Sequence, residues 1–239
     1  MPSELLPHLA TSPIPVKMVV AGGFGVGKTT FVGAISDIEP LTTEAAMTTV
    51  GEHVDDRSQV GAKTTTTVAM DFGRVAVDQS LVLYLFGTPG QDRFGFMWDD
   101  LVRGALGAVV LVDSRRIEDS FAALDYFERR SVPFVVAVNR FDGNLHHGLD
   151  DIREALSVSP NVPLLAIDAR RRDDVKATVL AMLEHVLERF APQVDEVLLN
   201  ANRNHEAYAR HGRVVPDAVG GYAGPLAGLH AGKIGRAHV

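Results

Sequence analysis

The sequence predicts an α/β fold in which helices cover both faces of a mostly parallel six-stranded sheet, giving three αβα layers with one antiparallel edge strand. Three observations support this prediction. From Val16 onward, short apolar runs alternate with helix-like stretches. The runs are almost continuously aliphatic, as is typical of strands buried on both faces. Hydrophobic residues make up 46% of the chain and charged residues 22%, which is enough apolar material for a globular core.

Strands are predicted first, because their apolar runs are the clearest signal. Five runs are expected to form buried strands: residues 16–21, 81–86, 107–112, 133–138 and 162–167. A sixth segment, residues 68–77, precedes a VDQS turn and is expected to pair antiparallel with residues 81–86 as an edge hairpin.

Helices are predicted between these strands, at residues 28–38, 93–103, 117–130, 149–157 and 173–190. The last segment carries an apolar stripe with a period near 3.6 and is expected to pack on the sheet. Asp173 and Asp174 stand in its first turn, where the helix dipole favours negative charge. We therefore expect one domain over residues 16–192, preceded by a flexible leader of residues 1–15.

Two regions are expected to lack regular structure. Residues 42–66 are polar, contain glycine and show no clear period, which predicts a long loop. Residues 193–239 have too few apolar positions for a core of their own and are predicted to be an irregular tail. The last seven residues, KIGRAHV, resemble the translation of a sequencing-library adapter, so the end of the tail is interpreted as an artefact.

Composition argues against several function classes. The 239 residues include 23 lysines and arginines against 30 aspartates and glutamates, a net charge of −7, so no basic field favours nucleic acid. The absence of cysteine excludes disulfides and thiolate chemistry. No apolar run approaches the roughly 20 residues of a transmembrane helix. We expect a cytoplasmic protein, with membrane association only through partners.

The strongest motif is a glycine-rich loop between the first strand and the first helix. Residues 22–29 read GGFGVGKT and match G-x-x-x-x-G-K-[ST]. Backbone N–H groups of such a loop bind phosphate oxygens, while Lys28 reaches the β- and γ-phosphates and the Thr29 hydroxyl ligates Mg²⁺. A merely flexible turn is the alternative interpretation. Lys28 is also a catalytic candidate, and the predicted nucleotide-binding residues of the loop are Gly22, Gly25, Val26, Gly27, Lys28, Thr29 and Thr30.

A second motif addresses the base, which a phosphate loop does not contact. Asn139-Arg140-Phe141-Asp142 follows the strand at residues 133–138 and resembles the N-K-x-D element of small GTPases. The Asp142 carboxylate can accept from N1–H and the exocyclic amine of guanine, a donor pair that adenine lacks. Asn139 is expected to tie this loop to the phosphate loop, and the stem of Arg140 to lie over the base. An ordinary loop cap is the alternative.

The next predicted strand ends in Asp168, Ala169 and Arg170, which resembles the S-A-K element of the same proteins. This resemblance implies that the Ala169 N–H meets guanine O6. All three residues are therefore nucleotide-binding candidates, with a plain strand end as the alternative.

Two further segments resemble the switch regions. TVAMDF, starting at Thr67, is similar to the Rab-type T-I-G-V-D-F, which implies that Thr67 closes switch I on Mg²⁺ and the γ-phosphate and that residues 42–66 form a long switch I loop. The neighbouring threonines 64–66 are alternatives.

The second switch candidate is GTPGQ at residues 87–91, where small GTPases carry D-x-x-G-Q. The resemblance implies that Gly90 meets the γ-phosphate and that Gln91 orients the attacking water, as a catalytic residue. Gly87 replaces the aspartate that holds Mg²⁺, and Asp71 and Asp113 are the candidates to compensate for it.

In this order the motifs resemble the Ras-like small P-loop GTPases over residues 16–190. Within that group FGTPGQDRF, VVLVDSRRIEDSF and the Thr-rich loop look like the bacterial ATP/GTP-binding proteins of actinobacterial conservon operons, relatives of gliding-motility GTPases. The resemblance implies a guanine-nucleotide switch that hydrolyses GTP, slowly without a partner, in bacterial signalling. It implies Mg²⁺ as cofactor, GTP and GDP as ligands, and a roadblock/LC7-type protein and a membrane sensor histidine kinase as partners.

Two other functions stay open at this point. A nucleotide-dependent scaffold with negligible hydrolysis is favoured by Gly87, whereas Gln91 favours the enzyme. An ATP-binding P-loop protein is the other alternative, which leaves Asn139 and Asp142 as coincidence. The nine histidines form no zinc-binding pattern.

Overall fold

The computed structural model describes residues 13–39, 41–48, 65–77, 81–90, 97–143, 145–200 and 205–216. The chain divides into two compact units. One consists of residues 16–75 and 83–185, and the other of residues 1–15, 76–82 and 186–239. The predicted flexible leader lies outside the described residues up to position 12.

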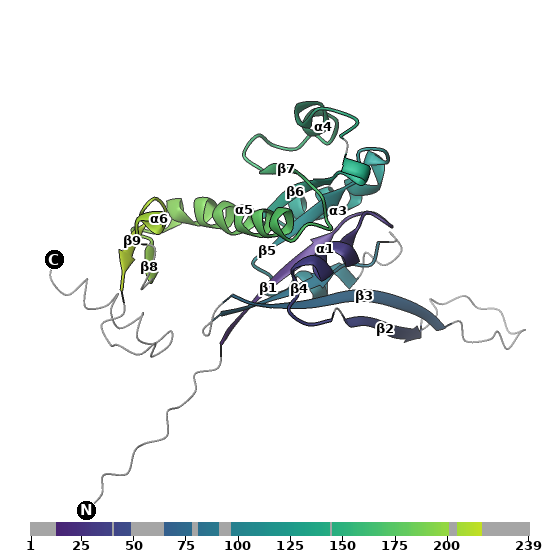
Figure 1. Ribbon diagram of the computed structural model, residues 1–239, viewed down its shortest axis with the longest axis horizontal. Helices are drawn as coiled ribbons and strands as arrows, with labels where there is room; N and C mark the ends of the chain where they lie inside the picture. The colour runs from purple at the N-terminus through teal and green to yellow at the C-terminus, as the bar shows by residue number, and fades with distance from the viewer. Residues whose placement is uncertain are drawn as a thin grey trace, which may run out of the picture. The chain divides into compact units, whose positions relative to one another are not determined.

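The main sheet has the strand order β2-β3-β4-β1-β5-β6-β7 (Figure 1). The pairs β1–β5, β5–β6 and β6–β7 are parallel, whereas β2 runs antiparallel to β3. The predicted fold class, a mostly parallel sheet between helices, is therefore confirmed. The strands are β1 Ile14–Ala21, β2 Leu41–Thr48, β3 Thr65–Ala76, β4 Leu81–Gly87, β5 Gly107–Val112, β6 Phe134–Asn139 and β7 Leu164–Ile167.

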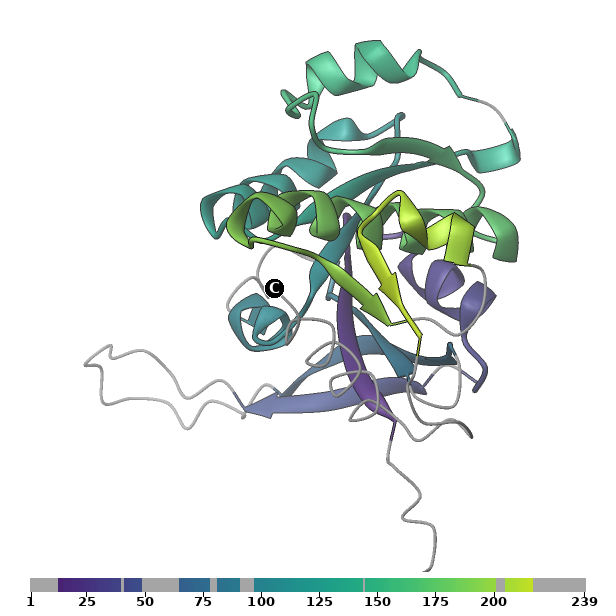
Figure 2. The same ribbon diagram turned by 90° about the vertical axis from the view of Figure 1, so that its left-hand side faces the viewer.

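The edge of the sheet differs from the prediction, because β2 adds a seventh strand. It pairs with β3 from Leu41 opposite Phe72 to Thr48 opposite Thr65. The predicted loop over residues 42–66 is therefore wrong at both ends, and residues 49–64 lie outside the described part. β3 and β4 are neighbours joined by four residues, too few for a parallel crossover, so they form the expected antiparallel pair. Figures 1 and 2 show the β2–β3 hairpin at one edge and β7 with α4 at the other.

The helices lie where the sequence predicts them but are mostly shorter. α1 ends at Ile35 because Ser36 already has an extended backbone. Of the segment predicted at residues 93–103, residues 98–102 are helical, and residues 93–96 lie outside the described part. The bounds are α1 Lys28–Ile35, α2 Trp98–Val102, η2 Ile117–Ser120, α3 Phe121–Arg129, η3 Phe141–Gly143, α4 Leu149–Ala155 and α5 Arg172–Phe190.

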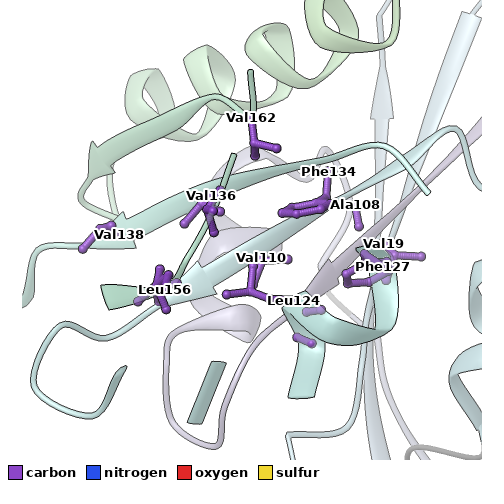
Figure 3. Packing of buried hydrophobic residues seen from close by; sticks show 14 of the residues in the cluster. Val19, Ala108, Val110, Leu124, Phe127, Phe134, Val136, Val138, Leu156 and Val162 are labelled. Atoms are coloured by element: carbon purple, nitrogen blue, oxygen red, sulfur yellow. The ribbon is translucent and has the colours of Figure 1, made fainter. Parts of the chain in front are cut away.

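Two helical layers enclose the sheet, since alternate residues of each central strand face opposite sides. Val110, Val136 and Phe134 belong to one buried cluster with residues of α2, α3 and α4, part of which is drawn in Figure 3. On the other face, α5 lies so close to β5 that a Cβ on Gly107 would collide with the Met182 side chain. This packing fixes the carboxyl ends of the parallel strands, where the predicted motifs lie.

The second unit corrects the prediction of an irregular tail. Its elements are η4 Ala191–Gln193, β8 Leu198–Asn200, α6 His205–Ala209 and β9 Arg213–Val215. β8 and β9 pair in parallel, and the α6 segment provides the crossover that such a pair requires. Short apolar runs of only three residues were too weak a signal in the sequence. Residues 217–239, including the suspected artefact, lie outside the described part.

No helix within the described ranges is both long and apolar enough to cross a membrane.

Candidate functional site

The glycine-rich loop links the end of β1 to the start of α1 and depends on glycine geometry. Gly22, Gly25 and Gly27 have φ values of 138°, 71° and 105°, a region that residues with a Cβ rarely adopt. At Gly27 a Cβ would also lie 2.9 Å from Asn139 Nδ2. The loop is thus shaped both by its own torsions and by close contact with the end of β6.

Lys28 is held under this loop rather than in solvent. Its side chain is 9% exposed, and Nζ donates to the carbonyl oxygens of Gly22 at 2.9 Å and Gly23 at 2.8 Å. Burial lowers the pKa of Lys28 to about 8, while the neighbouring Asp71 carboxylate acts in the opposite direction. A cation that is shielded from water and whose described hydrogen bonds go to neutral carbonyls offers a strong site for phosphate oxygens.

Gly90, three residues after β4, meets the phosphate loop. A Cβ on Gly90 would lie 2.7 Å from Lys28 Nζ and 2.9 Å from Phe24 Cα, so only glycine fits there. The structure therefore brings Gly90 and Lys28 together. Gln91, the predicted catalytic residue that follows, lies outside the described residues.

Asp71 lies beside the threonine that ends the loop motif. Thr29 Oγ1 donates to Asp71 Oδ2 at 2.8 Å, and Asp71 reaches it from β3. On neighbouring β4, a Cβ added to Gly87 would lie 3.0 Å from Asp71 Cβ and 3.1 Å from its Oδ2. The Asp71 carboxylate thus lies directly beside position 87, where the sequence lacks the expected aspartate.

Asp113, the other candidate to compensate for Gly87, has different partners. It is 3% exposed, and its carboxylate accepts from the backbone N–H, Nε and Nη2 of Arg115 at 3.0, 2.9 and 2.8 Å. These hydrogen bonds hold the pKa of Asp113 below its usual range. Of the two carboxylates, only Asp71 forms a hydrogen bond with Thr29 in the described structure.

The donor set at Thr29 fits Mg²⁺ bound together with a nucleotide. A hydroxyl and a carboxylate supply hard oxygen ligands, and protein-bound Mg²⁺ typically uses one or two carboxylates together with phosphate oxygens. Within the described residues no cluster of three or more acidic, histidine or cysteine side chains could hold a metal ion.

Thr67 is not brought to this site. It lies within β3, opposite Ala46 of β2, rather than in a loop at the strand entrance. Asp71 lies four positions further along the extended strand, a distance of about 13 Å along the backbone. The assignment of Thr67 to the metal site is therefore not supported by its position here, because β2 extends the hairpin through this region.

Asn139 joins the three loops at the carboxyl ends of β1, β6 and β7. Its Nδ2 donates to Val26 O at 3.0 Å, and its Oδ1 accepts from the Ala169 N–H at 3.1 Å. The predicted tie to the phosphate loop is therefore present. The Ala169 N–H, expected to meet guanine O6, donates instead to Asn139.

Arg140 and Asp168 have partners that the sequence did not reveal. Arg140 Nη2 donates to Asp174 Oδ2 of α5 at 3.2 Å, and the same oxygen accepts from Asp168 N at 2.8 Å. Asp174, predicted only to interact favourably with the helix dipole, thus connects the loop after β6 with the loop after β7, the two loops that carry the candidate base-binding residues. The Arg140 guanidinium points to α5 and not over a base position.

Asp168 and Arg170 form a two-point ion pair, with Nε–Oδ1 at 2.9 Å and Nη2–Oδ2 at 2.7 Å. The Arg170 hydrogen bonds lower the pKa of Asp168 to about 2. The third base-loop residue, Asp142, lies in η3, and its side chain is outside the described part of the chain.

The loop after β5 contributes two arginines that the sequence analysis did not assign to the site. The Arg115 guanidinium lies over the Phe141 ring, 4.1 Å from its centroid. Arg116 Nη2 donates to Phe24 O of the phosphate loop at 3.0 Å. Their position directly after a buried parallel strand was the available signal, since ligands of α/β sheets bind at the carboxyl ends of strands.

Comparison with protein families gives a match over most of the chain. Residues 20–210 match the family described as "Conserved hypothetical ATP binding protein". This range contains every candidate site residue named above.

Comparisons with individual proteins are more limited. The chain is 47% identical over 51 residues to the molybdenum cofactor guanylyltransferase of Vibrio parahaemolyticus, covering 21% of this chain and 26% of that protein. The enzyme of the same name from Photobacterium profundum is 46% identical over 57 residues, 24% of this chain and 29% of that protein. The chain thus spans only about a quarter of the length of these relatives. Among solved structures, the FeoB G-domain from Methanococcus jannaschii aligns with a TM-score of 0.48 and 14% identity, covering 72% of this chain and 97% of that one.

Proposed function

The chain belongs to the family described as conserved hypothetical ATP-binding proteins. From nucleotide binding as the premise, we propose that the nucleotide is a guanine nucleotide and that the chain hydrolyses GTP to GDP and phosphate. The observation that supports guanine most strongly is the double contact of Asn139, which joins the phosphate loop at Val26 to the β7 loop at Ala169. Asn139 begins the NRFD motif, so Asp142 follows three residues after this junction. A carboxylate at that place would accept the paired N–H donors of guanine.

Residues of the phosphate loop would bind the triphosphate. Its backbone N–H groups and Lys28 would contact the β- and γ-phosphates, and Gly90 would meet the γ-phosphate from the β4 side. Thr29 and Asp71 would hold Mg²⁺, which neutralises negative charge on the phosphates when bound. Gln91 would orient the attacking water.

Loss of the γ-phosphate would release the segment around Gly90, which is how such a switch reports its nucleotide state. We extend the proposal to bacterial signalling in the cytoplasm, with a roadblock/LC7-type protein and a membrane sensor histidine kinase as partners. The support for these partners is the resemblance of FGTPGQDRF and VVLVDSRRIEDSF to conservon-type proteins.

ATP binding is the second candidate function. The description of the family as ATP-binding favours it, and the ion pair between Asp168 and Arg170 leaves the β7 loop without an obvious guanine-specific arrangement. A scaffold that binds nucleotide with negligible hydrolysis is the third candidate, because Gly87 lacks a carboxylate.

Substitution of Asp142 tests the choice of base. Asp142→Asn should weaken GTP and GDP binding by at least about tenfold and favour xanthine nucleotides, whose extra carbonyl accepts a hydrogen bond where guanine donates one. Affinities for GTP, GDP, XTP and ATP would be measured by equilibrium titration in the parent and the variant.

Asp150→Asn is a matched control, because it makes the same chemical change at an exposed position of α4. It should leave all four affinities unchanged. Equal GTP affinity in Asp142→Asn and the parent would contradict guanine recognition, and tighter binding of ATP than GTP by the parent would favour the second candidate.

A further inference from the structure

Arg116 lies against the phosphate loop, and no role in nucleotide binding was predicted for it from the sequence. Its guanidinium donates from Nη2 to Phe24 O at 3.0 Å. A Cβ placed on Gly25, the next loop residue, would have Arg116 Nη2 as its nearest neighbour, at 3.8 Å. The guanidinium therefore lies directly against the apex of the loop.

This apex is also where the candidate γ-phosphate contacts converge. Gly90 lies against Lys28 Nζ and against the Cα of Phe24. The carbonyl of that same Phe24 receives the Arg116 hydrogen bond. Phe24 thus contacts both Gly90 and Arg116, which puts the Arg116 guanidinium close to the proposed γ-phosphate position at Lys28 and Gly90.

The surroundings of Arg116 position the guanidinium without burying it. Asp119 Oδ2 lies 3.4 Å from Nη1, and Asp113 Oδ2 lies 3.8 Å from Nη2, while the Arg116 side chain is 46% exposed. Asp113 is already bound by Arg115 at 2.8 Å. The Arg116–Asp119 pair joins two partly exposed side chains and is weak in water, so turning the guanidinium toward a phosphate loses little from this pair.

Asp119 of η2, three residues after Arg116, packs against Gly23 of the phosphate loop. A Cβ on Gly23 would lie 2.5 Å from Asp119 Cβ, so the loop and the η2 segment are in direct backbone-to-side-chain contact. Phe24, whose carbonyl accepts the Arg116 hydrogen bond, is 67% exposed, so the part of the loop that Arg116 contacts is open to solvent.

We propose that Arg116 is a catalytic residue of the proposed GTP hydrolysis, supplying from within the chain the guanidinium that stabilises the γ-phosphoryl group in the transition state. This inference rests on the proposed function. In the reaction the oxygen of water bonds to the γ-phosphorus. The bridging bond between that phosphorus and the β-phosphate oxygen breaks, its electron pair stays on GDP, and the proton of the water passes to inorganic phosphate.

Arg116 would act on the charge that shifts toward the β,γ-bridging oxygen and the γ-oxygens during this step. A planar guanidinium can bind two such oxygens at once, which the ammonium of lysine cannot do with the same geometry. Contacts made mainly in the transition state raise the rate without a matching gain in ground-state affinity.

Arg116→Ala in the full chain, with Arg116→Lys beside it, tests this role. We expect single-turnover hydrolysis of GTP to fall by about a hundredfold in Arg116→Ala, with only partial recovery in Arg116→Lys. GDP affinity should stay within about threefold of the parent, whereas binding of GDP with aluminium fluoride, a mimic of the transferring phosphoryl group, should be lost.

Arg129→Ala is the matched control, since Arg129 is exposed on α3 and pairs only with Asp125 four residues away among the contacts described. It should match the parent in every measurement. Unchanged hydrolysis and fluoride-dependent binding in Arg116→Ala would overturn the inference. The inference would also be overturned if GDP affinity and melting temperature fell together with the hydrolysis rate, because Arg116 would then only stabilise the structure of the loop.

The same experiment separates this inference from the proposed function. A parent protein that binds guanine nucleotide but shows neither hydrolysis nor fluoride-dependent binding would overturn the role of Arg116 and leave nucleotide binding intact. A parent that binds no guanine nucleotide would overturn both.

Discussion

The Lys28 ammonium is the positively charged side chain of the phosphate loop, and its pKa is strongly shifted. In the folded chain its pKa is lowered from 10.5 to about 8, first of all by burial. Below pH 8 the protein therefore retains a buried ammonium at a cost in stability, and this cost is relieved as the pH rises from 8 toward 10.5. A bound phosphate should raise the pKa of Lys28 again, because a neighbouring anion stabilises the charged ammonium.

We predict that nucleotide binding by the parent takes up a proton at Lys28. GDP affinity should fall by about tenfold between pH 7 and pH 9, because the protonated fraction of a group with a pKa near 8 falls by that factor. Titration calorimetry in buffers of different ionisation enthalpy would measure both the affinity and the proton uptake.

Lys28→Arg provides the comparison, since arginine stays charged over this range. The pH dependence of GDP affinity in Lys28→Arg reports the titration of the nucleotide alone and can be subtracted from that of the parent. Proton uptake of equal size in Lys28→Arg and the parent would show that Lys28 does not titrate on binding.

At the residue scale, motif spacing predicted the glycine-rich turn after β1 and the Asn139 tie, because these features depend on contacts between strand ends that every sheet of this type brings together. The nucleotide-binding roles of the glycines and Lys28 stay predictions. Which of Asp71 and Asp113 lies free to take the place of the missing aspartate at position 87 could not be predicted from the sequence. It depends on which carboxylate forms an ion pair with a neighbouring arginine, and Arg115 pairs with Asp113. The direction of Arg140 was missed for a similar reason, because Asp174 attracts it from a helix distant in sequence.

At the scale of elements, the buried parallel strands were predicted almost to the residue, since apolar runs of this kind have few alternatives. β2 was missed because LTTEAAMT has only two large apolar residues, Leu41 and Met47, among threonines, alanines and a glutamate. Its strand conformation follows from pairing along β3, and such tertiary pairing outweighs weak local preference. For the same reason Thr67 was expected at the entrance of the strand instead of within it.

The β3–β4 pair carries a prediction of its own, because Asp71 and Gly87 face each other across these strands. Asp71→Asn should raise the Mg²⁺ concentration needed for tight GTP binding by about tenfold, as expected for a carboxylate that orients metal-bound groups. Gly87→Asp should bring no improvement, because a Cβ at position 87 would already lie 3.1 Å from Asp71 Oδ2, so the new carboxylate would stand beside a like charge that repels it. Release of GDP would be followed against Mg²⁺ concentration.

Moving the carboxylate from one strand to the other makes the decisive comparison. The double substitution Asp71→Gly with Gly87→Asp should recover most of the metal affinity lost in Asp71→Asn, provided that melting temperatures show a folded protein. A Mg²⁺ dependence in Asp71→Asn equal to that of the parent would exclude Asp71 from the metal site.

At the scale of the whole molecule, the candidate site and the C-terminal elements belong to different compact units. The phosphate loop, Asp71, Gly90, the NRFD motif and the β7 loop all lie within residues 16–75 and 83–185. The described hydrogen bonds that build the site, from Thr29–Asp71 to Asn139–Val26, join residues of that unit only.

Removal of residues 193–239 should therefore leave GDP and GTP affinity within about twofold of the full chain, as expected when a deletion lies outside the compact unit that carries the site and the two act independently. The truncation removes β8, α6 and β9 and ends after α5, so the last helix against the sheet stays whole. Equilibrium titration and thermal unfolding would be compared with the full chain and with a shorter deletion of residues 217–239. A tenfold loss of affinity in the longer deletion alone would show that the β8–α6–β9 segment supports the nucleotide site, and the site would then depend on both units.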